Sequence, residues 1–153
     1  MRYGSQLWMT ENLDYDTGDS LSRSYPSSYS DYASKHKLGR LYSAQNATNW
    51  VQPGWRLPTP TDWNTLRNFF GGDPLIAYAA LIDEGASGFN AQLGGYYGSY
   101  FADVEVNGRY CSDSADQTSY QVAFFYGARS KFYMDTSYAG YYFSLRFVKD
   151  LIG

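Results

Sequence analysis

The spacing of apolar residues changes near Gly85, and this change constrains the fold more than any other feature of the chain. Before this point, apolar residues recur at the three- and four-residue spacing of short amphipathic helices. After it, apolar and polar residues alternate, which is typical of half-buried β-strands. The sequence therefore predicts an α+β fold with two to three short helices followed by an antiparallel sheet of short strands and long loops. The expected helices cover residues 41–50, 59–70 and 73–83, and the expected strands cover residues 101–106, 120–126, 130–136 and 141–148.

Short local signals mark where these elements begin and end. Either Thr59 or Thr61 can cap the second helix, and Pro60 suits its first turn if Thr59 is the cap. Ahead of the helices, residues 3–9 and 13–15 are predicted to form strand-like pieces, and residues 16–37 a long loop. The turns expected between the later strands are Asn107-Gly108, Gly127-Ala128 and Ala139-Gly140.

Alternation also assigns faces to the last two strands. Phe132 and Met134 are predicted to point into the core, and Lys131, Tyr133 and Asp135 towards solvent. Arg146 lies on the face opposite the apolar stripe of the final strand, so it needs a carboxylate or carbonyl partner if it is covered. That stripe comprises Tyr141, Phe143, Leu145 and Phe147.

Length and charge narrow the class of protein. A chain of 153 residues with 44% hydrophobic content can bury one core, so we expect a single domain over residues 1–153. The net charge of −3, without a run of Lys or Arg, argues against a nucleic-acid partner. The sequence contains no apolar stretch long enough to span a membrane, and residues 1–5 contain no apolar signal core. We therefore expect any export to depend on residues that precede these in a longer precursor.

The residues that could carry catalysis or bind metal are few and scattered. Cys111 is the only cysteine, which excludes an internal disulfide and a cluster of thiolates, and we expect it to be a small buried hydrophobe. His36 is the only histidine and lies in a polar segment, while Asp83 and Glu84 are adjacent and therefore point apart. The string at residues 52–54 lacks the carboxylate that calcium prefers. We expect no enzymatic activity, no cofactor and no metal site.

Tyrosine is the residue that points to function. The chain has 17 tyrosines, and many of those in its last third are interleaved with Ser, Asp, Gly and Asn. This mixture resembles antibody recognition loops, where tyrosine supplies rigid amphipathic contacts and the small polar residues adaptable hydrogen bonds. Tyr96 and Tyr141 are expected to pack in the core instead, and Asp113, Asp116, Arg129 and Asp135 to be rim charges. The predicted ligand-binding residues are Tyr97, Ser99, Tyr100, Tyr110, Ser112, Asp113, Ser114, Tyr120, Tyr126, Arg129, Tyr133 and Asp135.

Several motifs occur together in one order along nearly the whole chain. They are Gln6–Leu13, Gly39–Ser43, Pro53–Thr59 followed by Asp62-Trp63, Gly88–Asn90, Gly94–Tyr96 and Gly140–Asp150. In this order they resemble the Fibrobacter succinogenes major paralogous domain. That family is similar to a branch of the C-type lectin-like fold related to formylglycine-generating enzymes, and the resemblance implies pairing of the first and last strands. Formylglycine-generating chemistry needs a cysteine pair, which this chain lacks.

Some members of this lectin-like group are the variable proteins of diversity-generating retroelements. In these proteins, adenine-directed mutagenesis diversifies a C-terminal binding surface. The resemblance implies a recognition or display domain, outside the cell or on a phage particle, that binds a protein or glycan ligand on a cell or phage surface. The alternative is a structural cell-surface assembly module in which the same aromatics pack against neighbouring domains. A calcium-dependent lectin and an enzyme are the less favoured alternatives.

Overall fold

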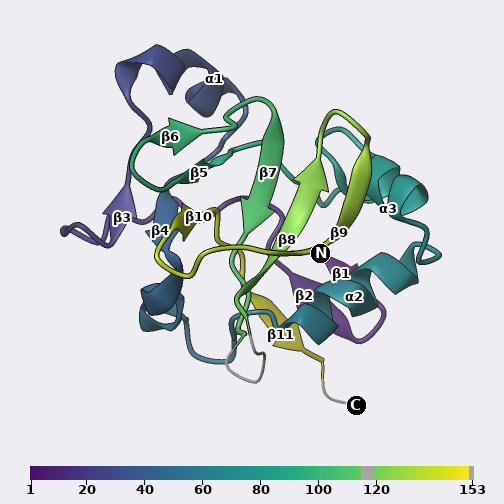
Figure 1. Ribbon diagram of the computed structural model, residues 1–153. Coiled ribbons are helices and arrows are strands. Elements are labelled where there is room, and N and C mark those ends of the chain that lie inside the picture. The colour runs from purple at the N-terminus through teal and green to yellow at the C-terminus, as the bar shows by residue number, and fades with distance from the viewer. Residues whose placement is uncertain (115–118, 152–153) are drawn as a thin grey trace.

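The computed structural model describes residues 1–114 and 119–151, and its described residues combine helices with antiparallel sheets, so the fold is α+β (Figure 1). The helices are η1 (Ser27–Tyr29), α1 (Ser30–Lys35), η2 (Ala44–Trp50), α2 (Pro60–Phe69) and α3 (Pro74–Leu81), η denoting a 3-10 helix. The strands are β1 (Arg2–Tyr3), β2 (Gln6–Trp8), β3 (Ser22–Arg23), β4 (Leu41–Ser43), β5 (Tyr96–Tyr97), β6 (Phe101–Ala102), β7 (Asn107–Tyr110), β8 (Gln121–Tyr126), β9 (Lys131–Thr136), β10 (Tyr142–Phe143) and β11 (Val148–Asp150).

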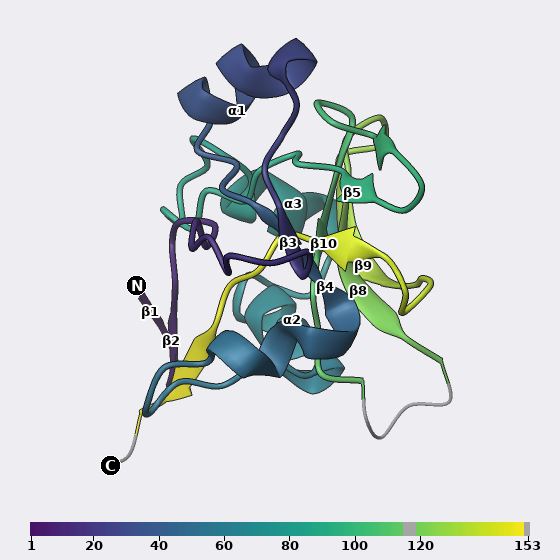
Figure 2. The ribbon, with the colours of Figure 1, turned by 90° about the vertical axis from the view of Figure 1, so that its left-hand side faces the viewer.

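The longest strands form the antiparallel sheet β7-β8-β9. Helices α2 and α3 pack on one face of this sheet (Figures 1 and 2), and on its other face Val122 belongs to a buried cluster with Ala44 and Ala47 of the 3-10 helix η2. Phe125 and Phe132 stack on the helix side with ring centroids 4.4 Å apart, and Trp63 of α2 meets Phe132 edge-on. Phe132 and Met134 point inward and Lys131, Tyr133 and Asp135 outward, as alternation predicts.

The two ends of the chain meet in a second sheet, ordered β1-β2-β11. Strand β11 pairs antiparallel with β2, and Val148 lies opposite Trp8. This pairing of first and last strands is the arrangement that the family resemblance implies. Arg146, just before β11, is buried and donates to the backbone carbonyl oxygens of Phe89 and Asn90. The predicted need for a carbonyl partner is therefore confirmed.

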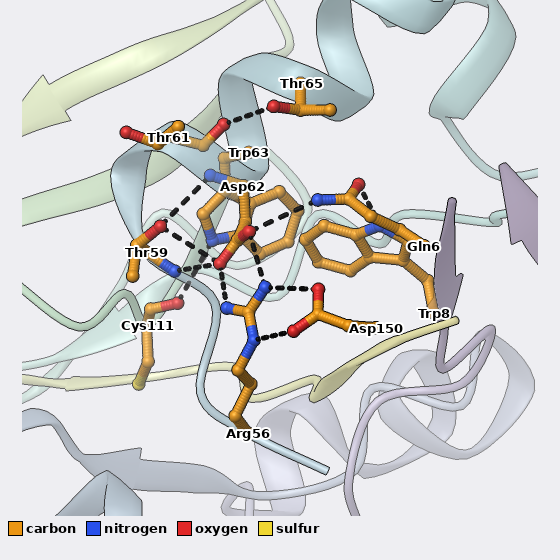
Figure 3. A network of polar contacts seen from close by, with 10 residues as sticks. All are labelled: Gln6, Trp8, Arg56, Thr59, Thr61, Asp62, Trp63, Thr65, Cys111 and Asp150. Atoms are coloured by element: carbon orange, nitrogen blue, oxygen red, sulfur yellow. Dashed lines mark hydrogen bonds and ion pairs between the residues drawn. The ribbon is translucent and has the colours of Figure 1, made fainter. Parts of the chain in front are cut away.

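A polar network centred on Asp62 holds α2 against the terminal strands (Figure 3). Thr59 caps the helix because its hydroxyl accepts from the amide of Asp62 at 3.1 Å, while the Asp62 carboxylate accepts from the amide of Thr59 at 2.8 Å. The same carboxylate pairs with both terminal nitrogens of Arg56, which also binds Asp150 of β11 at 2.8 Å. Gln6 of β2 donates to Asp62 at 3.2 Å. Asp62 therefore joins α2 to β2 directly and to β11 through Arg56.

Several expected elements differ in the structure. Residues 41–43 form strand β4, and only 44–50 are helical, because Tyr42 and Ser43 pair with β10. Strands β1 and β2 confirm the strand-like pieces expected within residues 3–9, but the expected loop over residues 16–37 contains β3, η1 and α1. The stretch 141–148 is strand only at its ends.

The predicted turn at Asn107-Gly108 is part of strand β7, and the chain turns earlier. Asp103 and Glu105 adopt φ values of 60° and 72° and carry the turn that glycine was expected to make. Gly108 serves close packing instead, because a Cβ there would lie 2.3 Å from the carbonyl oxygen of Gln92. The turns expected at residues 127–128 and 139–140 are present.

Candidate functional site

The face of β7-β8-β9 opposite α2 and α3 carries a group of aromatic side chains that contact one another. Strands β5, β7, β8 and β9 and the segment just before β10 all contribute to it. All of its side chains are half-buried except that of Phe124, which is 5% exposed and lies at the centre. We call this surface the aromatic face, and it comprises Tyr96, Arg109, Phe124, Tyr126, Tyr133 and Tyr141.

Ring contacts fix the geometry of the aromatic face. Tyr126 stacks on Phe124 with centroids 5.4 Å apart, and Tyr133 meets the same ring edge-on at 5.5 Å. At the other end Tyr96 stacks on Tyr141 at 5.2 Å. Aromatic pairs in these arrangements add roughly 0.5–1.5 kcal/mol beyond burial, so the rings are held in place before any ligand arrives.

Arg109 joins the two halves of the aromatic face. Its guanidinium carbon lies 4.6 Å from the centroid of Phe124 and 4.8 Å from that of Tyr96. Asp103 accepts a hydrogen bond from Nη1 of Arg109 at 2.7 Å, so the cation is neutralised locally. The group is therefore a stacked, charge-paired platform built on rigid strands.

The hydroxyls of Tyr96 and Tyr133 remain protonated at neutral pH. Burial raises the pKa of Tyr133, and the nearby carboxylate of Asp135 raises it further. Burial likewise raises the pKa of Tyr96, with a smaller contribution from Asp103. The two hydroxyls can thus donate hydrogen bonds to a ligand while the rings supply apolar contact.

The structure divides the predicted site residues among four places. Tyr126, Tyr133 and Asp135 point to the same side of β8 and β9, and exposed Arg129 lies in the turn between these strands. A shallow pocket of about 390 Å³ opens beside them, with Tyr126, Arg129 and Tyr133 in its lining. These four residues are the part of the prediction that the fold brings together.

A second group lines a different pocket, of about 370 Å³: Ser112, Asp113, Ser114 and Tyr120. Ser112 is only 1% exposed, and its hydroxyl donates to the carbonyl of Gln121 at 2.5 Å. The hydroxyl of Tyr120 accepts from the amide of Ser112 at 3.2 Å, and its ring stacks on Phe143. Burial raises the pKa of Tyr120. Ser112 and Tyr120 therefore use their polar groups within the fold, and Asp116 lies outside the described residues.

The expectation that Tyr110 contacts a ligand is wrong in this fold. Its side chain is 0% exposed and packs against Trp63 and Phe125. Its hydroxyl donates to Oδ1 of Asn12 at 2.7 Å and accepts from the amide of Gln92 at 2.9 Å. Tyr110 lies opposite Ala123 of β8, whose side chain is in the core cluster beneath α2, so Tyr110 is on the helix side of the sheet.

The third group, Tyr97, Ser99 and Tyr100, lies on the β5–β6 hairpin. Tyr97 is half-buried and turned away from the aromatic face, whereas Ser99 and Tyr100 are exposed, Tyr100 to 71%. Arg109 and Phe124 are not among the predicted site residues. Tyr96 and Tyr141, predicted to pack in the core, are half-buried and pack against the core cluster that contains Phe143. The alternation of β8, with Phe124 and Tyr126 two residues apart, is the signal that could have found Phe124.

Chemistry at the few reactive groups is limited by their surroundings. Cys111 is fully buried, and burial raises the pKa of its thiol to about 12, as fits a small buried hydrophobe. His36 lies 3.5 Å from Asp83 on a different part of the molecule. Among residues 1–114 and 119–151, no three His, Cys, Asp or Glu side chains gather closely enough to hold a metal ion. In the same part of the chain, no helix has the length and apolar character that crossing a membrane requires.

Comparison with known proteins gives one match. Neither the curated proteins nor the solved structures contain one that matches this chain. The model of the Fibrobacter succinogenes major domain matches residues 1–149, which include the Arg56–Asp62 network and the aromatic face. The chain therefore belongs to the Fibrobacter succinogenes major domain family.

Proposed function

We propose that this protein is a non-enzymatic binding domain of C-type lectin-like fold, which recognises a protein or glycan on a cell or phage surface. The aromatic face is its ligand-binding surface. The observation that carries the proposal is the arrangement of Tyr133 and Tyr126 around Phe124, with Arg109 stacked beside them. Tyrosines that present both a ring and a protonated hydroxyl on a rigid scaffold are the groups most enriched at recognition surfaces.

The location of the platform supports recognition over an internal structural role. It lies on the face of β7-β8-β9 opposite α2 and α3, and its members other than Phe124 are half-buried, so their outer edges remain in contact with solvent. Asp135 and Arg129 flank it and would tune which ligands are accepted. The paired first and last strands, together with the ordered family motifs, support the C-type lectin-like fold.

Diversification by a retroelement is the sharpest form of this proposal. Tyr126, Tyr133 and Asp135 are compatible with adenine-directed mutation of asparagine codons, and each points out of the sheet. A reverse transcriptase gene near this one, with an adenine-rich near-copy of codons 97–138, would support it. Buried Tyr110 should then be constant among the diversified copies.

A structural assembly module is the second candidate, because an exposed apolar group lies elsewhere on the molecule. Phe69 at the end of α2 is 53% exposed, and Leu75 and Ile76 of α3 are 51% and 59% exposed. Such a group can pack against a neighbouring domain. Substituting Leu75 and Ile76 with serine should abolish self-association or domain docking under this alternative and leave ligand binding unchanged under the preferred one.

The test of the binding proposal is a screen of glycans and surface proteins with the wild type and a Tyr126→Ala/Tyr133→Ala variant. Tyr15→Ala is the matched control, because Tyr15 is 56% exposed and outside the aromatic face. A hot-spot tyrosine is worth about 2 kcal/mol, or roughly thirtyfold in affinity, so we expect binding at least roughly thirtyfold weaker in the double variant and unchanged in the control. If the double variant melts normally and binds as tightly as the wild type, the aromatic face is not the ligand-binding surface.

A further inference from the structure

Arg23 stacks on aromatic rings on a different surface, and it has no carboxylate partner within residues 1–114 and 119–151. Strands β3, β10, β5 and β6 present one face of the five-stranded sheet, ordered β3-β4-β10-β5-β6. Tyr142 lies opposite Tyr97, and Tyr97 lies opposite Phe101, so the three rings share a face. Arg23 reaches these rings from β3. We call this surface the Arg23 face: Arg23, Tyr97, Phe101 and Tyr142.

The guanidinium of Arg23 is held in place by the rings alone. Its central carbon lies 4.1 Å from the centroid of Tyr97 and 5.2 Å from that of Tyr142. Within the described residues its side chain makes no hydrogen bond or ion pair, and its Nε is buried without an acceptor. The side chain has therefore lost much of its rotamer freedom, yet its terminal N–H groups are unused by the protein.

Comparison with the other arginines sets Arg23 apart. Arg109 also stacks on two rings, but its Nη1 is satisfied by Asp103 at 2.7 Å. Arg67 also buries an Nε without an acceptor, but it stacks on no ring in the described residues. Arg146 stacks on Phe89 but donates to the carbonyls of Phe89 and Asn90, so among the described arginines that stack on rings Arg23 is the one with unused donors. A planar fork of N–H donors matches the two oxygens of a carboxylate.

We propose that the Arg23 face binds a glycan that carries carboxylate groups, with the guanidinium of Arg23 receiving the carboxylate of a uronic acid residue. This goes beyond the proposed function, because it assigns a separate surface and a ligand class. Tyr142 donates its hydroxyl proton to the carbonyl of Ser20 at 2.7 Å, so its oxygen can still accept from a sugar hydroxyl. The hydroxyl of Tyr97 makes no hydrogen bond within the described residues and can donate or accept.

The shape of the sheet favours a glycan over an acidic peptide. A peptide that adds to a sheet needs a strand edge with several free backbone groups. The edges here are β3 and β6, and each is two residues long. A sugar ring needs no such edge, since it is recognised by side-chain hydroxyls and aromatic surfaces. The net charge of −3 means that a polyanion is not attracted by the whole molecule, so binding must depend on Arg23 itself.

The experiment is calorimetric titration of the protein with a trimer of galacturonate, up to about 10 mM. The matched ligand control is the same trimer with its carboxylates methyl-esterified. The matched protein variants are Arg23→Met, Arg23→Lys and Arg67→Met, each checked for a normal thermal melt. We expect wild type and Arg67→Met to bind the free acid alike, and Arg23→Met to bind at least about tenfold more weakly. Arg23→Lys should be weakened as well, because lysine keeps the charge and loses the fork.

Three results would overturn the proposal. One is the absence of galacturonate binding by the wild type, and another is equal binding by wild type and a normally melting Arg23→Met. The third is equal or stronger Arg23-dependent binding of a glutamate oligopeptide, which would make the ligand a peptide. Repeating the titration with Tyr126→Ala/Tyr133→Ala separates this inference from the proposed function. That variant should bind galacturonate normally even if it loses the ligand of the aromatic face.

Discussion

Replacing Tyr110 with phenylalanine tests whether this tyrosine belongs to the core or to a recognition surface. The substitution keeps the ring and removes a hydroxyl that donates to Asn12 at 2.7 Å and accepts from the amide of Gln92 at 2.9 Å. Oδ1 of Asn12 keeps its bond from Nε of Arg146 at 2.9 Å, so it remains satisfied. The amide of Gln92 is left buried without an acceptor.

An unsatisfied buried donor costs about 1–3 kcal/mol, so we expect a loss of about 2 kcal/mol in the free energy of unfolding. For a chain of this length, that corresponds to a fall in Tm of about 4–8 °C. The assay is urea unfolding followed by tryptophan fluorescence, with Tyr133→Phe as the control. The hydroxyl of Tyr133 makes no hydrogen bond within the described residues, so this variant should stay within about 0.5 kcal/mol of the wild type.

Three outcomes bear on the placement of Tyr110 in the core. A Tyr110→Phe variant as stable as the wild type would refute the burial and bonding of Tyr110. A variant that is destabilised yet binds the ligand of the aromatic face unchanged would agree with the structure. Weaker binding by a fully stable Tyr110→Phe variant would indicate that Tyr110 contacts the ligand.

The remaining predictions concern the scaffold. Burial alone would raise the pKa of Asp62, but hydrogen bonds from Arg56 and Thr59 together hold it below its ordinary value of 3.8. The ionised carboxylate of Asp62 therefore stabilises the fold above pH 3.8, and this stabilisation is lost as the pH falls below that value. Asp62→Asn should cost about 1–3 kcal/mol in the free energy of unfolding at pH 7, and the variant should lose less stability than the wild type as the pH falls. Urea midpoints from pH 7 to pH 3 measure both effects. Gly95 has φ of +66°, and a Cβ there would lie 2.1 Å from a backbone oxygen of β6. Gly95→Ala should therefore lower the free energy of unfolding by about 3 kcal/mol or more. Gly18 has φ of +76° and open space around it, so Gly18→Ala should cost about 1 kcal/mol by the same assay. Equal costs for the two variants would contradict the close approach at Gly95.

The elements that were predicted correctly are those whose formation depends on contacts between residues close together in the sequence. Helix α2 begins at Pro60 because Thr59 and Asp62 satisfy each other's backbone groups within four residues. Strands β8 and β9 follow from alternation on both sides of a short turn at Gly127. The inward positions of Phe132 and Met134 need only the period of a strand. In each case the deciding contacts lie close together in the sequence.

The elements that were predicted wrongly depend on distant contacts. Residues 41–43 have helical spacing, but Tyr42 and Ser43 pair with β10 about a hundred residues later in the chain, and that pairing overrides the local preference. Asn107-Gly108 is a common turn dipeptide, yet the close approach of the Gln92 carbonyl makes this glycine part of a strand.

The sequence by itself determined the family, the α+β class and the abundance of tyrosine available for recognition. Composition does not say which tyrosines reach solvent, because that depends on which face of each strand the helices cover. The tertiary structure put Tyr110 under α2, brought Arg109 between Phe124 and Tyr96, and stacked Arg23 on Tyr97. Each of these contacts joins residues from separate strands or helices, and only the packed sheets bring them within reach of one another.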